Sequence, residues 1–219
     1  MASINFKIPA LNKSFYKEDS VPLIKKRIDF IVDKYGDIID NVATLTNLNK
    51  DIIKSFIFIE SRGEETAQSP YAVGLMQVGL ATASDSLVKE KSTGRLSSGE
   101  EAILKKYLGS RIKNISNLKP NQKTIGKTWI TKSDLLKPEF NILVGSIIIK
   151  QLIDEFTEND VPRLDKVAVL YNAGRYGKIG KMTIAHTGSI EDLHSKLPKE
   201  PSAYITKLLG VNSTLDILT

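Results

Sequence analysis

The sequence of 219 residues has no cysteine, only two histidines and one tryptophan. Without cysteine the chain can form neither a disulfide nor a thiolate metal site, and its redox compartment cannot be inferred. His186 and His194 lie eight residues apart in a polar segment, where solvated side chains are a better interpretation than zinc ligands. We therefore expect no metal and no cofactor. Aromatic residues are also scarce, at 7%, and with many Ile and Leu this favours a helical core over a β-sandwich.

Long apolar runs are absent too. The first 20 residues lack the apolar core of a signal peptide, and the longest apolar run, 142–149, is too short to span a bilayer. We expect a soluble protein that is made without a standard export signal. The net charge is +6, and we interpret the basic residues as scattered along the sequence. Solubility is the simplest meaning of this surplus, and a mild affinity for an anionic wall, membrane or nucleic acid is the alternative. No nucleic-acid-binding motif is visible.

Apolar residues recur three or four positions apart along most of the chain, which predicts a mainly α fold with at most a small β-hairpin region. Asn47 or Asn49 can cap the helix that ends at Gly63, and Ser97 or Ser98 can cap another. Residues 1–45 form a predicted N-terminal helical extension, and residues 46–219 form one domain with a long insert at about 92–137. The predicted helices cover 22–35 (with Gly36 as its stop), 38–45, about 50–60, 82–91, 100–108, 138–156, 165–171, 190–197 and 202–209.

Glu60 is the most informative residue. It ends the apolar run 52–60 and lies on the same helical face as Ile53, Phe56 and Ile57, at spacings of seven, four and three. Burial disfavours the charged form of a carboxyl group, so we expect a raised pKa and a retained proton near neutral pH. A protonated acid beside an apolar wall is suited to protonating the leaving oxygen of a glycosidic bond. The nearby Glu64 and Glu65 lie in a polar loop, where solvated charges are a better interpretation than a second catalytic carboxylate.

Several short motifs follow Glu60 in a fixed order. The resemblance that they carry covers about residues 46–210 and is to the catalytic domain of the soluble lytic transglycosylases, a lysozyme-like family that cleaves peptidoglycan. Two departures concern the cleft wall: the segment before Gly74 is one residue short, and Leu80 replaces the usual proline. The motifs are Glu60-Ser61, Ser69, Gly74-Leu75-Met76-Gln77, Thr82-Ala83, Pro138-Glu139-Phe140-Asn141-Ile142-Leu143-Val144-Gly145, Ala168-Val169-Leu170-Tyr171-Asn172-Ala173-Gly174 and Glu200-Pro201-Ser202-Ala203-Tyr204.

The resemblance implies lysozyme-like architecture and a lyase that breaks the bond between N-acetylmuramic acid and N-acetylglucosamine. Glu60 would act as both acid and base, and 1,6-anhydro ends would form without water. Five of the implied substrate-binding residues also have a structural alternative: a turn for Ser69, core packing for Met76, a capping or turn amide for Gln77, a core aromatic for Tyr171 and a helix-dipole carboxylate for Glu200. The implied substrate-binding residues are Ser69, Met76, Gln77, Tyr171, Asn172, Glu200 and Tyr204.

Two other functions stay open at this point. One is a hydrolytic muramidase of the goose-type lysozyme kind, which uses water. The other is a non-catalytic component of a phage particle or secretion apparatus that binds the wall. The expected partner is the peptidoglycan glycan strand, with no nucleic acid and no membrane span. Residues 1–45 offer a mount on a particle or apparatus. We expect the protein to act at the bacterial cell wall, and a phage-encoded or virion-associated enzyme fits this expectation.

Overall fold

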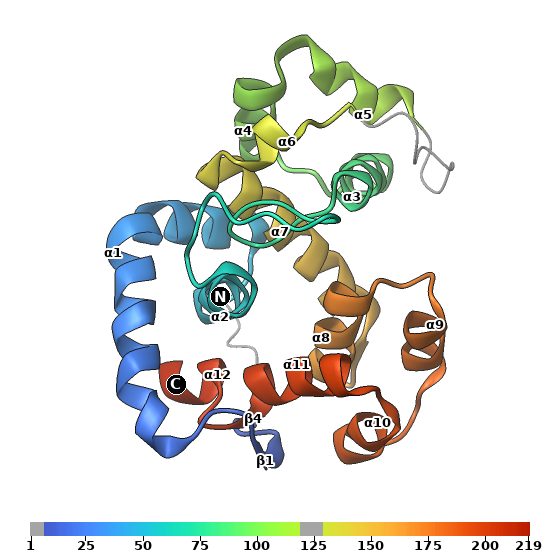
Figure 1. Ribbon diagram of the computed structural model, residues 1–219. Helices are drawn as coiled ribbons and strands as arrows, with labels where there is room; N and C mark the ends of the chain where they lie inside the picture. The colour runs from blue at the N-terminus through green and yellow to red at the C-terminus, as the bar shows by residue number, and fades with distance from the viewer. Residues whose placement is uncertain (1–6, 119–128) are drawn as a thin grey trace. The chain divides into compact units, whose positions relative to one another are not determined.

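The computed structural model describes residues 7–118 and 129–219, and it is mainly helical with two very small sheets (Figure 1). The predicted fold class is confirmed. Contacts divide the chain into two compact units. The inner unit is Phe30–Gln151, and the terminal unit combines the N-terminal segment up to Asp29 with Leu152–Thr219. Parts of the predicted extension (1–6) and of the insert (119–128) lie outside the described residues. In the described part, no helix combines the length and apolar character needed to cross a bilayer.

A single long helix stands where the sequence predicted two. Helix α1 runs over Val21–Thr46 and passes through Gly36 without a break. The prediction of a stop at Gly36 was wrong because the buried stripe continues on both sides, through Ile31, Tyr35, Ile39 and Val42. Glycine inside a helix costs only about 1 kcal/mol, and burial of an apolar stripe outweighs that.

The inner unit continues with α2 (Lys50–Ser61), α3 (Leu80–Ser92) and α7 (Pro138–Glu155). The Asn49 side chain caps α2 by accepting a hydrogen bond from the Asp51 amide at 2.7 Å, as predicted. The final cap is Arg62, in the left-handed conformation, one residue before the predicted Gly63. The predicted central helix is confirmed: every residue of α7 from Phe140 to Ile149 is buried.

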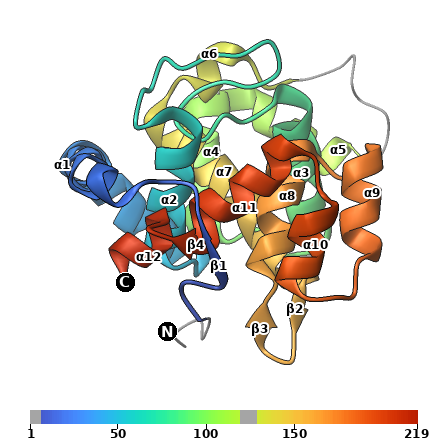
Figure 2. The ribbon, with the colours of Figure 1, turned by 60° about the horizontal axis from the view of Figure 1, so that its bottom comes forward.

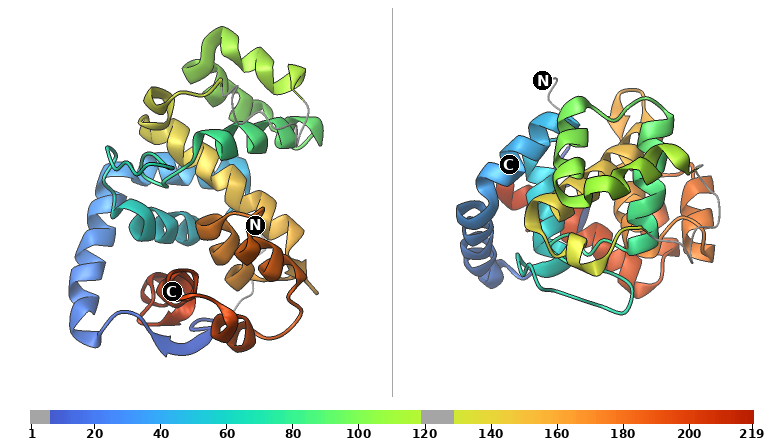
Figure 3. Two further views of the ribbon diagram at one scale, coloured as in Figure 1. Left: turned by 45° about the vertical axis from the view of Figure 1, so that its right-hand side comes forward. Right: turned by 90° about the horizontal axis from the view of Figure 1, so that it is seen from above.

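The insert folds into short helices, drawn in green and yellow in Figure 3. They are α4 (Ser98–Leu108), the 3₁₀ helix η2 (Gly109–Lys113), α5 (Asn114–Asn117) and α6 (Lys132–Leu135). Ser97 caps α4 in a reciprocal pair with Glu100, which confirms one of the two predicted caps. Arg111 ties η2 to α6 because its two terminal nitrogens donate to both oxygens of Asp134, at 2.6 and 2.8 Å.

This Arg111–Asp134 pair predicts a pH dependence of stability. Burial raises the pKa of the Asp134 carboxyl, but hydrogen bonds from Arg111 and Thr131 outweigh it, and the net pKa is lowered. The stabilisation is therefore complete above the pKa of an unfolded aspartate, about 3.9, and is lost as the pH falls through the lower pKa of the folded state. In urea unfolding, the wild type should exceed Asp134→Asn in stability at pH 6, and the difference should shrink towards about pH 2.5. An unchanged difference would contradict the role given to this pair.

The terminal unit contains both sheets. Strand β1 (Leu11–Ser14) pairs in parallel with β4 (Gly210–Val211), and β2 (Thr157–Glu158) pairs with β3 (Val161–Pro162) as a small antiparallel hairpin (Figure 2). The short 3₁₀ helix η1 (Glu18–Ser20) follows β1. The remaining helices are α8 (Leu164–Ala173), α9 (Lys178–Ala185), α10 (Ile190–Lys196), α11 (Lys199–Leu209) and α12 (Thr214–Leu218).

Helix α9 lies where the sequence predicted a loop. The glycines and basic residues of 174–181 favour a loop by composition, but Gly180 has a packing role. A Cβ at Gly180 would lie 2.2 Å from the Gly174 carbonyl oxygen, so only glycine permits this close approach. The prediction of a loop was therefore wrong because this backbone contact leaves no trace in the periodicity of the sequence.

Candidate active site

Helix α2 brings Glu60 to the end of a buried apolar face. Ile53, Phe56 and Ile57 have no exposed surface, as their spacing predicted. Glu60 itself is partly buried, one turn beyond them. A carboxyl group in this place has an apolar wall on one side and access to solvent, the two conditions that a proton donor to a bound sugar needs.

Ser61 fixes the end of α2 against the segment that follows. Its hydroxyl donates to the Leu75 carbonyl oxygen at 2.7 Å, with the Ile57 carbonyl at 3.2 Å as an alternative acceptor, and it accepts from the Gly63 amide at 3.1 Å. The residue next to the acid thus joins the helix to the glycine-flanked motif 74–77. Ser61 belongs to the sequence motif Glu60-Ser61, but this role was not predicted.

Ser69 and Gln77 shape the loop between them. The Ser69 hydroxyl accepts from the amides of Ala72 and Tyr71, at 3.0 and 3.3 Å, which is the turn role that the sequence left open. The Gln77 side-chain amide donates to the carbonyls of Ala67 and Gly74, at 2.9 and 3.0 Å. Both N–H groups of Gln77 are therefore engaged in the loop, and its side-chain oxygen is the part left to accept from a ligand.

The Met76 side chain belongs to the core. Met76 has no exposed surface, and a Cβ added at Gly145 of α7 would lie 2.6 Å from its sulfur. Its predicted contact with substrate is therefore wrong for the side chain in this conformation, and the packing alternative holds. The long, flexible methionine fills the space that the missing side chain of Gly145 leaves.

A Gly145→Ala variant is expected to lose about 1–3 kcal/mol of unfolding free energy because the new methyl group overpacks this contact. The gain in helix propensity, at most about 1 kcal/mol, works in the opposite direction. In a double-mutant cycle, Met76→Ala should remove most of the cost of Gly145→Ala. Additive effects of the two substitutions would show that the contact does not decide the stability.

Asn141 is a second residue of this site whose role was not predicted. It is fully buried on α7. Its side-chain oxygen accepts from the Met76 amide at 2.8 Å, and its side-chain nitrogen donates to the carbonyls of Val73 and Leu135, each at 2.8 Å. One amide thus satisfies three backbone groups from two separate segments. In the sequence, Asn141 stood out only as a member of the motif that begins at Pro138.

The glycine that opens the 74–77 motif allows this arrangement. Gly74 is in the left-handed region, at φ +82°, and a Cβ there would lie 2.4 Å from both the Leu135 carbonyl oxygen and the Asn141 side-chain nitrogen. Any larger residue would push Asn141 out of its place. The inner unit contains five of the site residues, which are Glu60, Ser61, Ser69, Met76 and Gln77. Hydrogen bonds join Ser61 to the Leu75 carbonyl and Gln77 to the Gly74 carbonyl.

The other predicted residues belong to the terminal unit. Tyr171 and Asn172 occupy the last turn of α8 and are partly exposed. Tyr204 is buried on α11, which packs against α8. Glu200 is exposed in the first turn of α11, where the positive end of the helix dipole stabilises a carboxylate. Of these four, the buried Tyr204 fits a packing role, and the other three are accessible.

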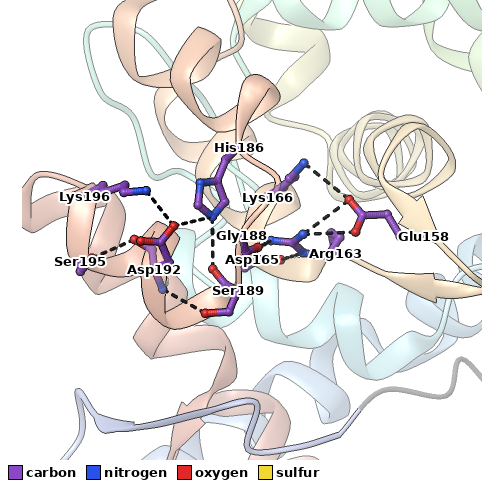
Figure 4. A network of polar contacts seen from close by, with 10 residues as sticks. All are labelled: Glu158, Arg163, Asp165, Lys166, His186, Gly188, Ser189, Asp192, Ser195 and Lys196. Atoms are coloured by element: carbon purple, nitrogen blue, oxygen red, sulfur yellow. Dashed lines mark hydrogen bonds and ion pairs between the residues drawn. The ribbon is translucent and has the colours of Figure 1, made fainter.

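A polar network fixes the start of α8 (Figure 4). Arg163 donates two hydrogen bonds to Asp165, at 2.8 and 3.0 Å, and one to the Gly188 carbonyl at 3.0 Å. Lys166 and Arg163 both pair with Glu158 of the hairpin, at 3.6 and 3.3 Å. The network thereby connects the hairpin, α8 and the loop before α10.

His186 belongs to the same network (Figure 4). Its Nε2 lies 3.2 Å from the Ser189 carbonyl oxygen and 3.6 Å from Asp192, which also pairs with Lys196 at 2.7 Å. His186 is buried, so the prediction of a solvated side chain was wrong for it. No group of three or more His, Asp or Glu side chains among residues 7–118 and 129–219 is placed to hold a metal ion.

Replacing Arg163 by methionine is expected to cost about 3 kcal/mol of unfolding free energy. The substitution leaves the buried Asp165 carboxylate and the Gly188 carbonyl without the guanidinium that donates to them. The side chain of Asp165 is 4% exposed, so water cannot take the place of the guanidinium. The double variant Arg163→Met/Asp165→Leu should recover most of the loss in urea unfolding. A double variant as unstable as the single one would refute this explanation.

Comparison with models of protein families and with curated protein sequences gives no match.

Proposed function

We propose that this chain is a lytic transglycosylase that cleaves peptidoglycan glycan strands, with Glu60 as its only acid and base. The observation that carries the proposal is the position of Glu60, partly buried at the end of the apolar face of α2. The serine beside it ties the helix to the 74–77 motif through the 2.7 Å bond to Leu75. The order of the sequence motifs supplies the reaction class.

In the proposed reaction, the protonated Glu60 gives its proton to the oxygen that links N-acetylmuramic acid to N-acetylglucosamine. The bond from the anomeric carbon to that oxygen breaks. The Glu60 carboxylate then takes the proton from the C6 hydroxyl of the muramic acid, and this oxygen forms a new bond to the anomeric carbon. The products are a 1,6-anhydro end and a free 4-hydroxyl, and Glu60 is protonated again, so no water is consumed.

A single carboxylate distinguishes this mechanism from ordinary glycosidases, which use two. Glu65 is a poor second candidate because it accepts from the Tyr35 hydroxyl at 3.0 Å and pairs with Lys34 at 3.4 Å. Glu64 is exposed and accepts from the Thr66 hydroxyl at 2.7 Å. We propose that the acetamido group of the substrate stabilises the developing positive charge, with the Gln77 side-chain oxygen as its candidate neighbour in the inner unit.

Digestion of purified peptidoglycan tests the function. We expect soluble fragments whose muramic acid ends are lighter, by one water, than the ends that hydrolysis leaves. Ends of the heavier kind would make the protein a muramidase instead. Binding to the wall without any released fragment would indicate a structural or wall-binding component of a particle or secretion apparatus.

A further inference from the structure

The insert, residues 92–137, carries the positive charge of the whole chain. It holds ten Lys and Arg against three Asp and Glu, a net charge of +7, whereas the other 173 residues hold 21 against 22. The basic residues are spread along the chain, as predicted, since 21 of the 31 lie outside the insert, but the insert has few carboxylates to balance its own ten. Such a charge asymmetry within one chain indicates an anionic partner for the basic segment.

The three carboxylates of the insert already have partners. Glu100 has no exposed surface and accepts from the Ser97 amide at 2.6 Å. Asp134 pairs with Arg111, and Glu101 pairs with Lys91 of α3. Two of the three carboxylates are therefore paired with basic side chains, and the third has no exposed surface.

Four lysines of the insert are exposed, and in the described part of the chain no carboxylate pairs with them. We call them the lysine surface: Lys105, Lys113, Lys132 and Lys137.

Two ion pairs bring these four lysines into one region. Arg111 of η2 pairs with Asp134 of α6 at 2.6 Å, and Lys106 of α4 pairs with Glu139 of α7 at 2.6 Å. Each residue of the lysine surface is one or two positions from a member of these pairs. The two ion pairs thus connect the segments that carry the four lysines, which are α4 and η2 on one side and α6 and the start of α7 on the other.

The side chains in this region favour a partner that is recognised by charge alone. Tyr107 is partly buried and donates to Glu139 at 2.8 Å, and the ring nitrogen of Trp129 is buried. Neither aromatic residue is exposed as a platform for stacked bases. Both arginines of the insert are engaged with carboxylates, Arg95 with Glu90 and Arg111 with Asp134. The exposed cations are lysines, which act as mobile point charges and not as a rigid fork.

We propose that the lysine surface binds a flexible phosphodiester polymer without bases, of the poly(polyol phosphate) kind. The proposal rests on the proposed function in one respect: an enzyme that cleaves glycan strands meets such polymers where they are joined to the wall. Binding would hold the enzyme at its substrate through contacts away from the C-terminal end of α2, where Glu60 lies. Each lysine that neutralises a phosphate releases a counterion, so affinity falls as salt rises.

The test measures binding of fluorescently labelled poly(glycerol phosphate) to the full chain by anisotropy, at several salt concentrations. Four lysines are replaced by glutamine in the test variant: Lys105, Lys113, Lys132 and Lys137. A control variant loses the same charge from exposed lysines elsewhere: Lys7, Lys17, Lys25 and Lys26.

We expect the test variant to bind at least about tenfold more weakly than the control variant. The slope of the logarithm of its affinity against the logarithm of the salt concentration should be smaller in magnitude by about one for each phosphate that a replaced lysine had neutralised. Equal weakening in both variants, or no binding by the wild type, would overturn the proposal. Tighter binding of duplex DNA than of poly(glycerol phosphate) at the same salt would also overturn it and assign the surface to nucleic acid.

Digestion of peptidoglycan stripped of phosphate polymers separates this proposal from the proposed function. The test variant should digest the stripped material at the wild-type rate. If it does so but poly(glycerol phosphate) does not bind the wild type, the lysine surface fails and the enzyme assignment stands. If the polymer binds but the wild type releases no fragments, the enzyme assignment fails and the binding surface stands.

Discussion

A Glu60→Gln variant is expected to lose at least about 10³-fold in the rate of glycan-strand cleavage while it keeps the fold. Loss of a positioned acid and base costs about 10² to 10⁴ in rate for each role, and here one residue has both. Glutamine has nearly the shape of a protonated glutamate but cannot give up a proton to the leaving oxygen. The measurement is the release of soluble fragments from purified peptidoglycan, beside thermal unfolding of both proteins.

Glu64→Gln is the matched control for this substitution. Glu64 lies four residues further on, is exposed, and accepts a hydrogen bond from the Thr66 hydroxyl. The control should keep the wild-type rate. If Glu60→Gln digests the wall normally, or if Glu64→Gln loses as much activity, Glu60 is not the proton donor.

The second large effect is expected at Asn141. An Asn141→Ala variant should lose about 3–5 kcal/mol of unfolding free energy, because it leaves the Met76 amide and the Leu135 carbonyl unpaired. The Val73 carbonyl keeps its bond from the Val78 amide at 3.0 Å. Each buried unsatisfied group costs about 1–3 kcal/mol, and neither Met76 nor Leu135 has exposed surface. For a chain of this length the melting temperature should fall by roughly 10 °C.

Asn117→Ala supplies the control, since Asn117 is exposed on α5 and surface substitutions usually stay within about 0.5 kcal/mol. Calorimetry or urea unfolding of the three proteins provides the comparison. A loss below about 1 kcal/mol in Asn141→Ala would mean that water or a shifted side chain takes over these bonds, and that Asn141 does not hold the 74–77 motif in place.

The sequence predicted what depends on periodicity and capping. The helix 138–156 could be predicted because its apolar residues continue for five turns, and the caps Asn49 and Ser97 because their side chains act within three residues. The face of Glu60 could be predicted from the spacing of its neighbours along α2. These features are local, so nearby residues determine them.

What the sequence could not predict depends on contacts between distant residues. Gly36 looked like a stop because the burial that keeps α1 continuous through it comes from other elements. Asn141 gave no sign of its three bonds, because their partners lie up to 68 residues away. For Met76 the sequence left both substrate contact and core packing open, and only its packing against Gly145 decided for the core. The net charge of the insert could be counted from the sequence, but the partners of its carboxylates Glu101 and Asp134 could not be predicted from it.

The most direct test of the central claim is digestion of peptidoglycan in water labelled with heavy oxygen, followed by mass analysis of the muramic acid ends. If Glu60 directs the C6 hydroxyl to the anomeric carbon, the new ends will be anhydro and will carry no heavy oxygen. Ends that contain heavy oxygen would contradict the account, because the attacking oxygen would then come from the solvent and not from the sugar.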